Sequence, residues 1–369
     1  MRYRAWLIAV LMLAIGAVVF AGCGGDDSSS SSGASGGSSS GGDKGKVAVL
    51  LPDSKSSVRW ETVDRPFLKK AFDDAGIGNE IQNAEGDKST QQQQAEQAIT
   101  NGAKVLLLVN LDSGSGAAIA ANAKSQGVKV IDYDRLTLNG DSDYYVSFDN
   151  EQVGKLQGEG LVKCLGNTNG QSIAELNGSP TDNNATLFKN GYDSVLKPLY
   201  DSGKLKKIAD QSVPEWDNQK ALTIFEQMLE KNGNKIDAVL AANDGLGNAA
   251  ISALKQRKLA QIPVTGQDAT LQGIQNIVNG DQCMTVYKAI KKEADAASKL
   301  AISLAKGEDP QGVDDSVNNE SKDVPAILLD PVSVTKDNIS EYTNEPDFPK
   351  VEEICAGKLA ADCKEIGLQ

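Results

Sequence analysis

The sequence contains no histidine. Histidine is the most frequent general base near neutral pH and the most frequent ligand of transition metals, so the usual forms of both kinds of site are missing. Enzymes built on carboxylates or lysine are not excluded by this absence. The formal charge of −13 makes a nucleic-acid-binding protein a poor interpretation, because such proteins carry basic surfaces.

Nucleotide-binding and metal-binding motifs are absent as well. There is no G-x-x-x-x-G-K-[ST] phosphate loop, and no G-x-G-x-x-G opens the first predicted helix. No two cysteines have the C-x-x-C spacing of a zinc site. We therefore expect no metal and no cofactor, and a ligand without phosphate groups.

The N-terminus has the pattern of an export signal. A basic start, residues 1–4, precedes an apolar run over residues 5–21 that is too short for a comfortable membrane span. Phe20-Ala21-Gly22-Cys23 is similar to a bacterial lipobox, which predicts a signal peptide over residues 1–23 and a lipid on Cys23. Residues 24–45, rich in Ser and Gly, predict a flexible linker. The sequence thus predicts an extracytoplasmic protein anchored to the membrane, and an uncleaved anchor helix is the alternative.

Four cysteines follow the lipobox: Cys164, Cys283, Cys355 and Cys363. An even number in an exported chain favours disulfides over free thiols. Cys355 and Cys363 are close enough in sequence for a local bridge, which would leave Cys164 to pair with Cys283. Neither the connectivity nor the alternative of free buried thiols is decided by the sequence.

The order of apolar segments predicts an α/β fold. Strand-like runs such as KVAVLLP, KVLLLVN and VKVIDYD alternate with helical patterns over residues 65–76, 91–102 and 116–127. Buried strands separated by helices indicate a parallel sheet covered on both faces. The pattern restarts at residue 151, with strands QSIAELNG, KKIADQSV, DAVLAAND, PVTGQD and CMTVYK between further helices. We therefore predict two doubly wound parallel-sheet lobes.

Two later segments suggest that the chain returns to the first lobe. A long amphipathic helix is expected over residues 289–307, and VPAILLDPVSV reads as a further strand. We assign residues 46–148 and about 289–325 to an N-terminal lobe, and residues 149–288 and about 326–342 to a C-terminal lobe. Residues 343–369 form a tail without a strand pattern.

Polar residues follow many of the predicted strands, at Asp53, Asn110, Asp134-Arg135, Asn177, Asn243-Asp244 and Asp268. Open parallel sheets bind ligands beyond the carboxyl ends of their strands, although any one of these residues could simply cap a helix or form a turn. Asp, Asn and Arg together suit the hydroxyl groups of a sugar. Trp60 and Trp216 follow strand ends, one in each half, where aromatic rings could stack on the apolar faces of a sugar. Surface rings packed on their neighbours are the alternative.

Several segments resemble the periplasmic xylose-binding proteins, which are the substrate-binding components of ABC sugar importers and have the type I fold of the ribose- and galactose-binding proteins. The segments are Arg59-Trp60, Tyr133-Asp134-Arg135, YVSFDNEQVGKLQ, GSPTDNNATLF, AAND, TGQDATLQGI, MTVYK and KDVPAILLDPVSVTKDNI. They extend in order over nearly all of residues 46–339. The tail and the four cysteines lie outside the resemblance, and the loop around Trp216 departs from it.

The resemblance implies two lobes joined by three hinge crossings, with a monosaccharide bound between them. The residues implied to bind the sugar are Arg59, Trp60, Asp134 and Arg135 from the first lobe, with Asp182, Asn184, Trp216, Asn243, Asp268 and Lys288 completing the site. The two tryptophans would stack on opposite faces of the ring. The resemblance also implies a monomer that is not an enzyme and that serves a permease with a cytoplasmic ATPase.

Three alternatives remain open at this point. The ligand could be another monosaccharide, such as glucose, arabinose or ribose, or the protein could serve a chemoreceptor or a histidine kinase. A retaining glycosidase would need two carboxyl groups about 5 Å apart across the sugar. Asp134 beside Arg135 would be held ionised, which makes it a poor general acid.

Overall fold

The computed structural model describes residues 45–368, so the predicted signal peptide, Cys23 and nearly all of the predicted linker lie outside the described range. The N-terminal lobe is built on a sheet with the strand order β10-β11-β5-β4-β3-β1-β2. Neighbouring strands are parallel except β10 and β11. The strands are β1 (Lys46–Leu51), β2 (Gly78–Asn83), β3 (Val105–Leu108), β4 (Lys129–Tyr133), β5 (Tyr144–Phe148), β10 (Asp315–Asn318) and β11 (Asp323–Leu329).

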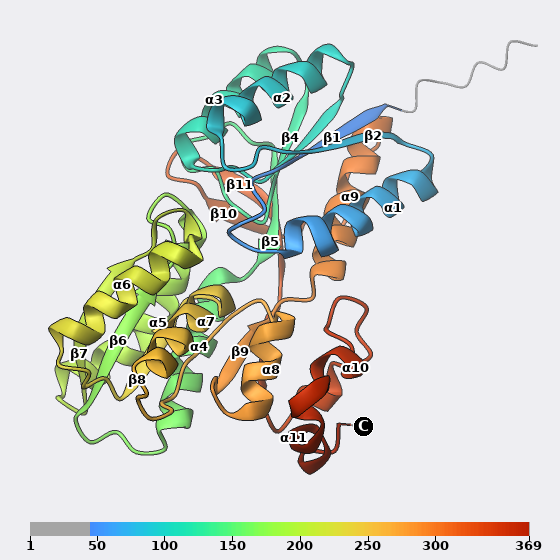
Figure 1. The fold of residues 1–369 in the computed structure, drawn as a ribbon. Coiled ribbons are helices and arrows are strands. Elements are labelled where there is room, and N and C mark those ends of the chain that lie inside the picture. Colours follow the sequence, from blue (N-terminus) through green and yellow to red (C-terminus); the bar gives the residue numbers. More distant parts are fainter. Residues whose placement is uncertain (1–44, 369) are drawn as a thin grey trace, which may run out of the picture. The chain divides into compact units, whose positions relative to one another are not determined.

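Helices cover both faces of this sheet (Figure 1). Alternate residues of a strand point to opposite faces, so Val47 and Val49 of β1 pack toward α1 (Arg65–Ala75) and α9 (Ile290–Lys306), whereas Ala48 and Leu50 pack toward the other pair. That pair is α2 (Lys88–Thr100) and α3 (Ser113–Ser125). The predicted parallel sheet covered on both faces is confirmed.

The C-terminal lobe repeats this architecture. Strand β6 (Gln171–Asn177) lies between β7 (Leu205–Ser212) and β8 (Ala238–Ala241), parallel to both. Strand β9 (Met284–Tyr287) pairs antiparallel with β12 (Val332–Thr335). The expected strand PVTGQD is reduced to a single parallel bridge between Val264 and Val239, so this prediction was wrong in extent.

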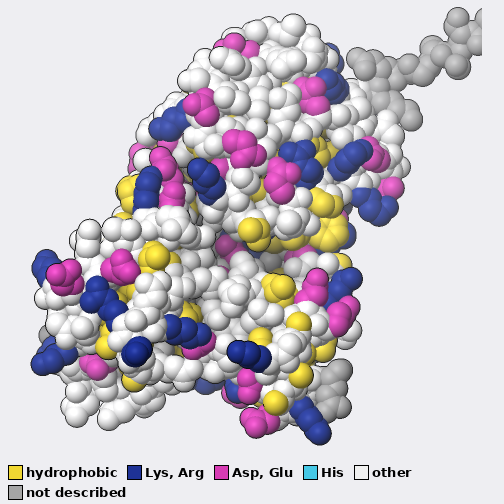
Figure 2. Space-filling model, viewed as in Figure 1, with side chains coloured by type: hydrophobic (Ala, Val, Ile, Leu, Met, Phe, Trp, Pro, Cys, Tyr) yellow, Lys and Arg dark blue, Asp and Glu magenta, His cyan; other side chains and the backbone are white. Residues whose placement is uncertain are grey.

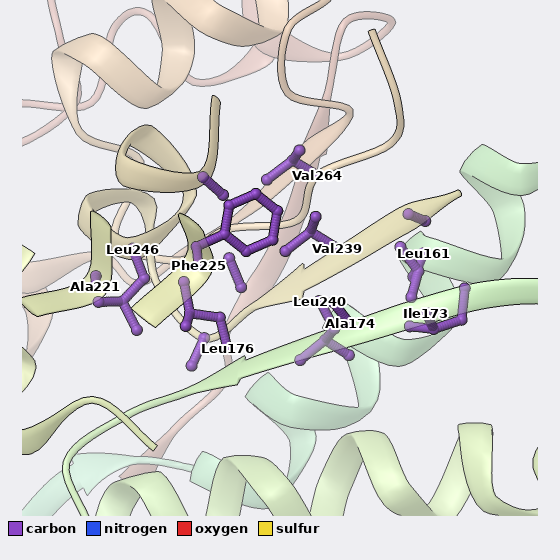
Figure 3. Close-up of a cluster of buried hydrophobic side chains, with 14 of the residues drawn as sticks. Leu161, Ile173, Ala174, Leu176, Ala221, Phe225, Val239, Leu240, Leu246 and Val264 are labelled. Carbon is purple, nitrogen blue, oxygen red and sulfur yellow. The ribbon is translucent and has the colours of Figure 1, made fainter. Parts of the chain in front are cut away.

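Five helices complete the C-terminal lobe: α4 (Asn150–Leu165), α5 (Asn183–Asp201), α6 (Asn218–Lys231), α7 (Asp244–Gln256) and α8 (Leu271–Asn279). Figure 3 shows part of the lobe's core, where Phe225 of α6 points into a cluster with Leu176, Val239 and Val264. The carboxyl ends of β6 and β8 are therefore held firmly where the polar residues of the loops begin.

The chain passes between the lobes three times. The first crossing lies between β5 and α4, the second between β9 and α9, and the third between β11 and β12. The third comes later than the expected boundary near residue 325, because Ala326 to Leu329 still pair with β5. VPAILLDPVSV therefore forms two strands, with Asp330-Pro331 between them.

The tail packs on the C-terminal lobe. Its short helices α10 (Val351–Ile354) and α11 (Ala360–Glu365) bury Ile354 and Cys363 against α8. Two disulfides are present: Cys164 to Cys283, with an S–S distance of 2.07 Å, and Cys355 to Cys363, with 2.13 Å. These are the pairs that the sequence spacing suggested.

Acidic and basic side chains are interspersed over the face seen in Figure 2, without a large area of one sign. Within residues 45–368, no helix has both the length and the apolar character that a membrane span requires.

Candidate functional site

One cavity brings together all ten predicted binding residues. It contains about 320 Å³ of space free of protein atoms, counting its opening to solvent. The lining residues are Arg59, Trp60, Asp134, Arg135, Asp182, Asn184, Trp216, Asn243, Asp268 and Lys288, together with Ser56, Ser57, Phe188 and Gln267. Residues far apart in sequence and from both lobes thus share one site, at the carboxyl ends of the strands, as expected for facing parallel sheets.

Arg59 organises the wall formed by the N-terminal lobe. Its Nε and Nη2 donate to the carboxylate of Asp64 at 2.9 and 2.8 Å, and its Nη1 donates to Asp134 at 2.8 Å. Nη2 also donates to Glu293 of α9 at 2.7 Å. Four of the five N–H donors of this guanidinium are thereby bonded to carboxylates, and the second hydrogen on Nη1 remains to meet a ligand.

The carboxyl groups around Arg59 differ in protonation. Burial alone would raise the pKa of Asp134, but the charges of Arg59, Lys288 and Arg135 overcome this effect and lower it. Burial raises the pKa of Glu293 to about 8, and the negative charges of Asp134 and Asp64 add to this effect against the opposing charge of Arg59. Near neutral pH the site therefore presents an ionised Asp134 as an acceptor, while Glu293 holds a proton.

Two polar contacts join the lobes at the site. Arg135 Nε lies 3.0 Å from Oδ2 of Asp182, and Oδ1 of the same carboxylate caps α5 by accepting from the backbone N–H of Asn184. Asn184 Nδ2 donates across the cleft to the backbone oxygen and to Oδ1 of Asp134, both at 3.0 Å. The N-terminus of α5 is thus positioned by its cap to face the Asp134-Arg135 pair.

Lys288 lies at the second crossing and is buried. Its Nζ is 3.3 Å from Oδ1 of Asp268 and 3.9 Å from Oδ2 of Asp134, so it is shared by carboxylates of the two lobes. Gln267 Oε1 is buried and accepts no hydrogen bond from any described residue, and Asp268 Oδ1 has the ion pair with Lys288 but no hydrogen bond of good geometry. Buried polar atoms usually have partners, so these acceptors indicate that the cavity is made for a ligand with hydroxyl or N–H donors.

Trp60 lies at the start of a π-helical turn, η1 (Trp60–Asp64), and is buried. Its indole N–H donates to Ser56 Oγ at 3.1 Å. The guanidinium carbons of Arg59 and Arg135 lie 4.3 and 5.6 Å from the ring centroid. The ring therefore fixes both cations while lining the cavity.

The backbone at Trp216 has a conformation that is rare for residues other than glycine. Glu215 and Trp216 have φ angles of 61° and 55°, the left-handed region that non-glycine residues rarely enter. The indole N–H donates to Asp182 Oδ2 at 3.0 Å, and the ring meets Phe188 edge to face at 6.3 Å. Gly178 is required beneath it, because a Cβ there would lie 2.0 Å from the ring. Such strained, well-supported conformations are concentrated at functional sites.

The comparison with known families decides the class of the chain. Residues 47–309 match the model of the periplasmic binding protein domain. The chain belongs to this family.

Individual relatives agree with the assignment. The chain is 40% identical over 310 residues to the D-xylose-binding periplasmic protein of Escherichia coli (strain K12), covering 84% of this chain and 92% of that protein. It is 42% identical to the D-xylose-binding periplasmic protein of Haemophilus influenzae, covering 80% and 88%. A solved ABC transporter solute-binding protein from Clostridium phytofermentans with bound β-D-glucose superposes with a TM-score of 0.78 at 30% identity, covering 84% and 99%.

Some residues of this periplasmic binding protein's cavity could not be read from the sequence. Phe188 lies one helical turn after Asn184, so helical periodicity could have identified it. Glu293 does not line the cavity but bonds to Arg59, and its position on the buried face of α9 gives no indication of that distant partner. Among residues 45–368, no group of three or more acidic, cysteine or histidine side chains is arranged to hold a metal ion.

Three strand-end residues have structural roles instead. Asp53 accepts from the backbone N–H groups of Lys55 and Ser56 and forms a turn. Asn110 donates to the backbone oxygen of Arg135 at 3.0 Å, and Asn177 accepts from the hydroxyl of Tyr192. The alternative interpretation, that such residues cap helices or form turns, holds for Asp53, whereas Asn110 and Asn177 bond to side chains or backbone 25 and 15 positions further along the chain.

Proposed function

We propose that this protein binds a monosaccharide, D-xylose, in the cavity between its lobes and delivers it to an ABC permease driven by a cytoplasmic ATPase. The observation that carries the proposal is the composition of the cavity. A buried site supplies charged donors, carboxylate acceptors, the unpaired oxygen of Gln267 and a tryptophan ring from each lobe, which matches a small neutral ligand with many hydroxyls. The xylose-binding relatives support the choice of sugar.

Binding and closure are coupled in this proposal. The sugar first contacts one lobe, and bending at the three crossings lets the other lobe complete the hydrogen bonds. Arg135 with Asp182 and Asn184 with Asp134 are the contacts that close the lobes directly. A sugar shifts the equilibrium toward the closed form only by its higher affinity for that form. The permease then recognises a surface that only the closed form presents.

We further propose that the protein acts as a monomer outside the cytoplasmic membrane, held by a lipid on Cys23. The sequence pattern of residues 1–23 supports the anchor. A binding role rather than catalysis is supported by Asp134, whose lowered pKa makes it a poor proton donor.

The test is calorimetric titration of the mature protein with D-xylose, L-arabinose, D-ribose and D-glucose. We expect the tightest binding with D-xylose. Tightest binding of D-glucose would favour the second candidate ligand, which is the sugar bound in the Clostridium phytofermentans relative. Absence of binding to every pentose and hexose would overturn the proposed function.

A further inference from the structure

A second cavity adjoins the proposed sugar cavity. It contains about 980 Å³ of space free of protein atoms, counting its opening to solvent, and both lobes line it. We call it the vestibule. Its lining residues are Asp53, Lys55, Ser56, Glu85, Gly86, Lys88, Leu111 and Arg135 from the N-terminal lobe, and Ser179, Pro180, Thr181, Asp182, Pro214, Glu215, Trp216 and Asp217 from the C-terminal lobe. Four of these residues also line the sugar cavity: Ser56, Arg135, Asp182 and Trp216.

The four shared residues form a continuous hydrogen-bonded partition from one lobe to the other. Arg135 Nη2 donates to Ser56 Oγ at 3.4 Å, and Arg135 Nε lies 3.0 Å from Asp182 Oδ2. That same oxygen accepts from the indole N–H of Trp216 at 3.0 Å. Each of the four is at most 7% exposed, so the partition is packed. The partition crosses from one lobe to the other at its centre, the Arg135–Asp182 ion pair.

The vestibule has the chemistry of a carbohydrate subsite. Hydroxyls of Ser179 and Thr181 and charged groups of both signs line it, which provides donors and acceptors for hydroxyl groups. Pro180, Pro214 and Leu111 add apolar surface for the C–H faces of a ring. Cations do not dominate its lining, which argues against a phosphorylated ligand.

We propose that the Arg135–Asp182 ion pair restricts this protein to monosaccharides, and that the vestibule beyond it accepts the second ring of a disaccharide once the pair is broken. The inference rests on the proposed function. With the pair intact, a substituent on the bound sugar meets two buried, mutually bonded side chains. Without it, the substituent passes into a space already large enough and polar enough for a second sugar.

The experiment compares each monosaccharide with its own disaccharide, D-xylose with xylobiose and D-glucose with cellobiose. A β-1,4 disaccharide carries its linkage at O4 of one ring and at O1 of the other, so the two ends together test whether either of these positions faces the partition. Affinities are measured by calorimetry for the wild type, Asp182→Ala and Asp182→Asn. The Asp182→Asn variant retains a capping side chain for α5 but lacks the charge, which protects the test against misfolding of the alanine variant.

The wild type should bind the monosaccharide and show no measurable binding of the disaccharide. In both Asp182 variants, we expect weaker monosaccharide binding and a disaccharide-to-monosaccharide affinity ratio at least tenfold above that of the wild type. The disaccharide should be displaced by the monosaccharide, because one ring occupies the shared cavity. Tight binding of the disaccharide by the wild type would overturn the inference.

Asn243→Ala is the matched control. Asn243 also caps a helix, by accepting from the backbone N–H of Leu246, and it lines the sugar cavity without touching the vestibule. Its variant should lose monosaccharide affinity with no rise in the ratio. If the disaccharide-to-monosaccharide affinity ratio rose equally in Asn243→Ala, or stayed unchanged in both Asp182 variants, the ion pair would not be what excludes disaccharides. A wild type that binds no monosaccharide would instead refute the proposed function itself.

Discussion

Arg59 balances three carboxyl groups at the edge of the cavity, so the charge of this cluster depends on pH. Asp64, Asp134 and Glu293 all bond to its guanidinium, within 2.7 to 2.9 Å. One cation cannot neutralise three buried anions, and the cluster responds by keeping Glu293 protonated. Glu293 is therefore a positioning residue, which holds Arg59 without lining the cavity.

Replacing Glu293 with glutamine should flatten the pH dependence of stability. Burial raises the pKa of Glu293 from 4.5 to about 8, so between these values the folded protein keeps a proton that the unfolded chain has released. This contribution to the free energy of unfolding is complete below pH 4.5 and is lost as pH rises through 8. Each unit of rising pH in this window lowers the free energy of unfolding by at most about 1.4 kcal/mol. The measurement is the unfolding free energy of both proteins by urea titration from pH 5 to 8.

Asp132 provides a control for the slope of the unfolding free energy against pH. Burial also raises the pKa of Asp132, to about 7, and this residue lies away from the Arg59 cluster. Asp132→Asn should change the slope without altering the pH profile of sugar affinity, whereas Glu293→Gln should alter both. If the unfolding free energy of Glu293→Gln changed with pH as it does in the wild type, Glu293 would not hold the proton assigned to it.

Arg135→Ala should abolish measurable sugar binding while the fold persists. The substitution removes a predicted sugar donor and leaves Asp182 buried without its cationic partner. Breaking a buried pair by removing one partner costs about 3–5 kcal/mol, which corresponds to more than a hundredfold in affinity if it falls on the closed form. Calorimetry measures the affinity and circular dichroism the fold. Lys70→Ala, at an exposed position, is the control, and near-wild-type affinity of Arg135→Ala would contradict the site assignment.

The sequence predicted many of the individual residues that line the cavity. Positions at strand ends and the family resemblance both indicated the loops that carry them. The sequence failed for residues whose role depends on tertiary distance. Glu293 meets Arg59 across 234 positions of the chain. Its place on the buried face of α9 follows the helical period, but that period does not identify Arg59 as its partner.

Helices α4 and α5 pack with their backbones close together, and this contact supports one wall of the cavity. A Cβ at Gly154 of α4 would lie 1.9 Å from the backbone oxygen of Phe188, and one at Gly191 of α5 would lie 2.1 Å from that of Glu151. Asn184 and Phe188, both on α5, line the cavity. The two glycines therefore set the position of a helix that carries binding residues.

Gly154→Ala should lower both stability and sugar affinity. The added methyl group forces α5 away from α4, since backbone rather than a mobile side chain blocks it. Overpacking of this kind costs about 1–3 kcal/mol of unfolding free energy, and displacement of Phe188 adds a loss of affinity. Thermal unfolding and calorimetry measure the two effects. Lys155→Ala, at the exposed next position, should leave both unchanged, and an unaffected Gly154→Ala protein would contradict the close packing.

Elements with a strong apolar pattern were predicted, whereas β10, a short and mostly exposed strand, was not. Strand β1 reads directly from KVAVLL, and α9 from its amphipathic period. The left-handed pair Glu215-Trp216 could not be predicted, because neither residue favours positive φ and the conformation depends on contacts with Asp182 and Gly178.

For the whole described chain, three crossings join the two lobes, and the proposed closure depends on them. The repeated α/β pattern predicted two lobes, and the return of the chain predicted several crossings. The tail's contacts were not predicted, because they depend on packing against α8 and β9 that leaves no periodic signal in residues 343–368.

Asp347 of the tail ties the second crossing to both lobes. Its carboxylate accepts from the hydroxyl of Tyr287 in β9 at 2.8 Å and from the backbone N–H of Lys291 in α9 at 3.2 Å. Lys288, which lines the sugar cavity, lies between these two residues. In the proposed mechanism, these contacts of the tail would favour the conformation in which Arg135 reaches Asp182.

Asp347→Ala should therefore reduce the population of the closed form without touching the sugar. A hydrogen bond to a charged group contributes about 1.5–3 kcal/mol, and loss of the lower value would weaken apparent affinity about tenfold. Calorimetry measures the affinity, and small-angle X-ray scattering without sugar should show a larger radius of gyration. Asp337→Ala, an exposed carboxylate beyond β12, is the control. Unchanged affinity and an unchanged radius in Asp347→Ala would show that the tail merely covers α8, because a covering segment has no reason to affect closure.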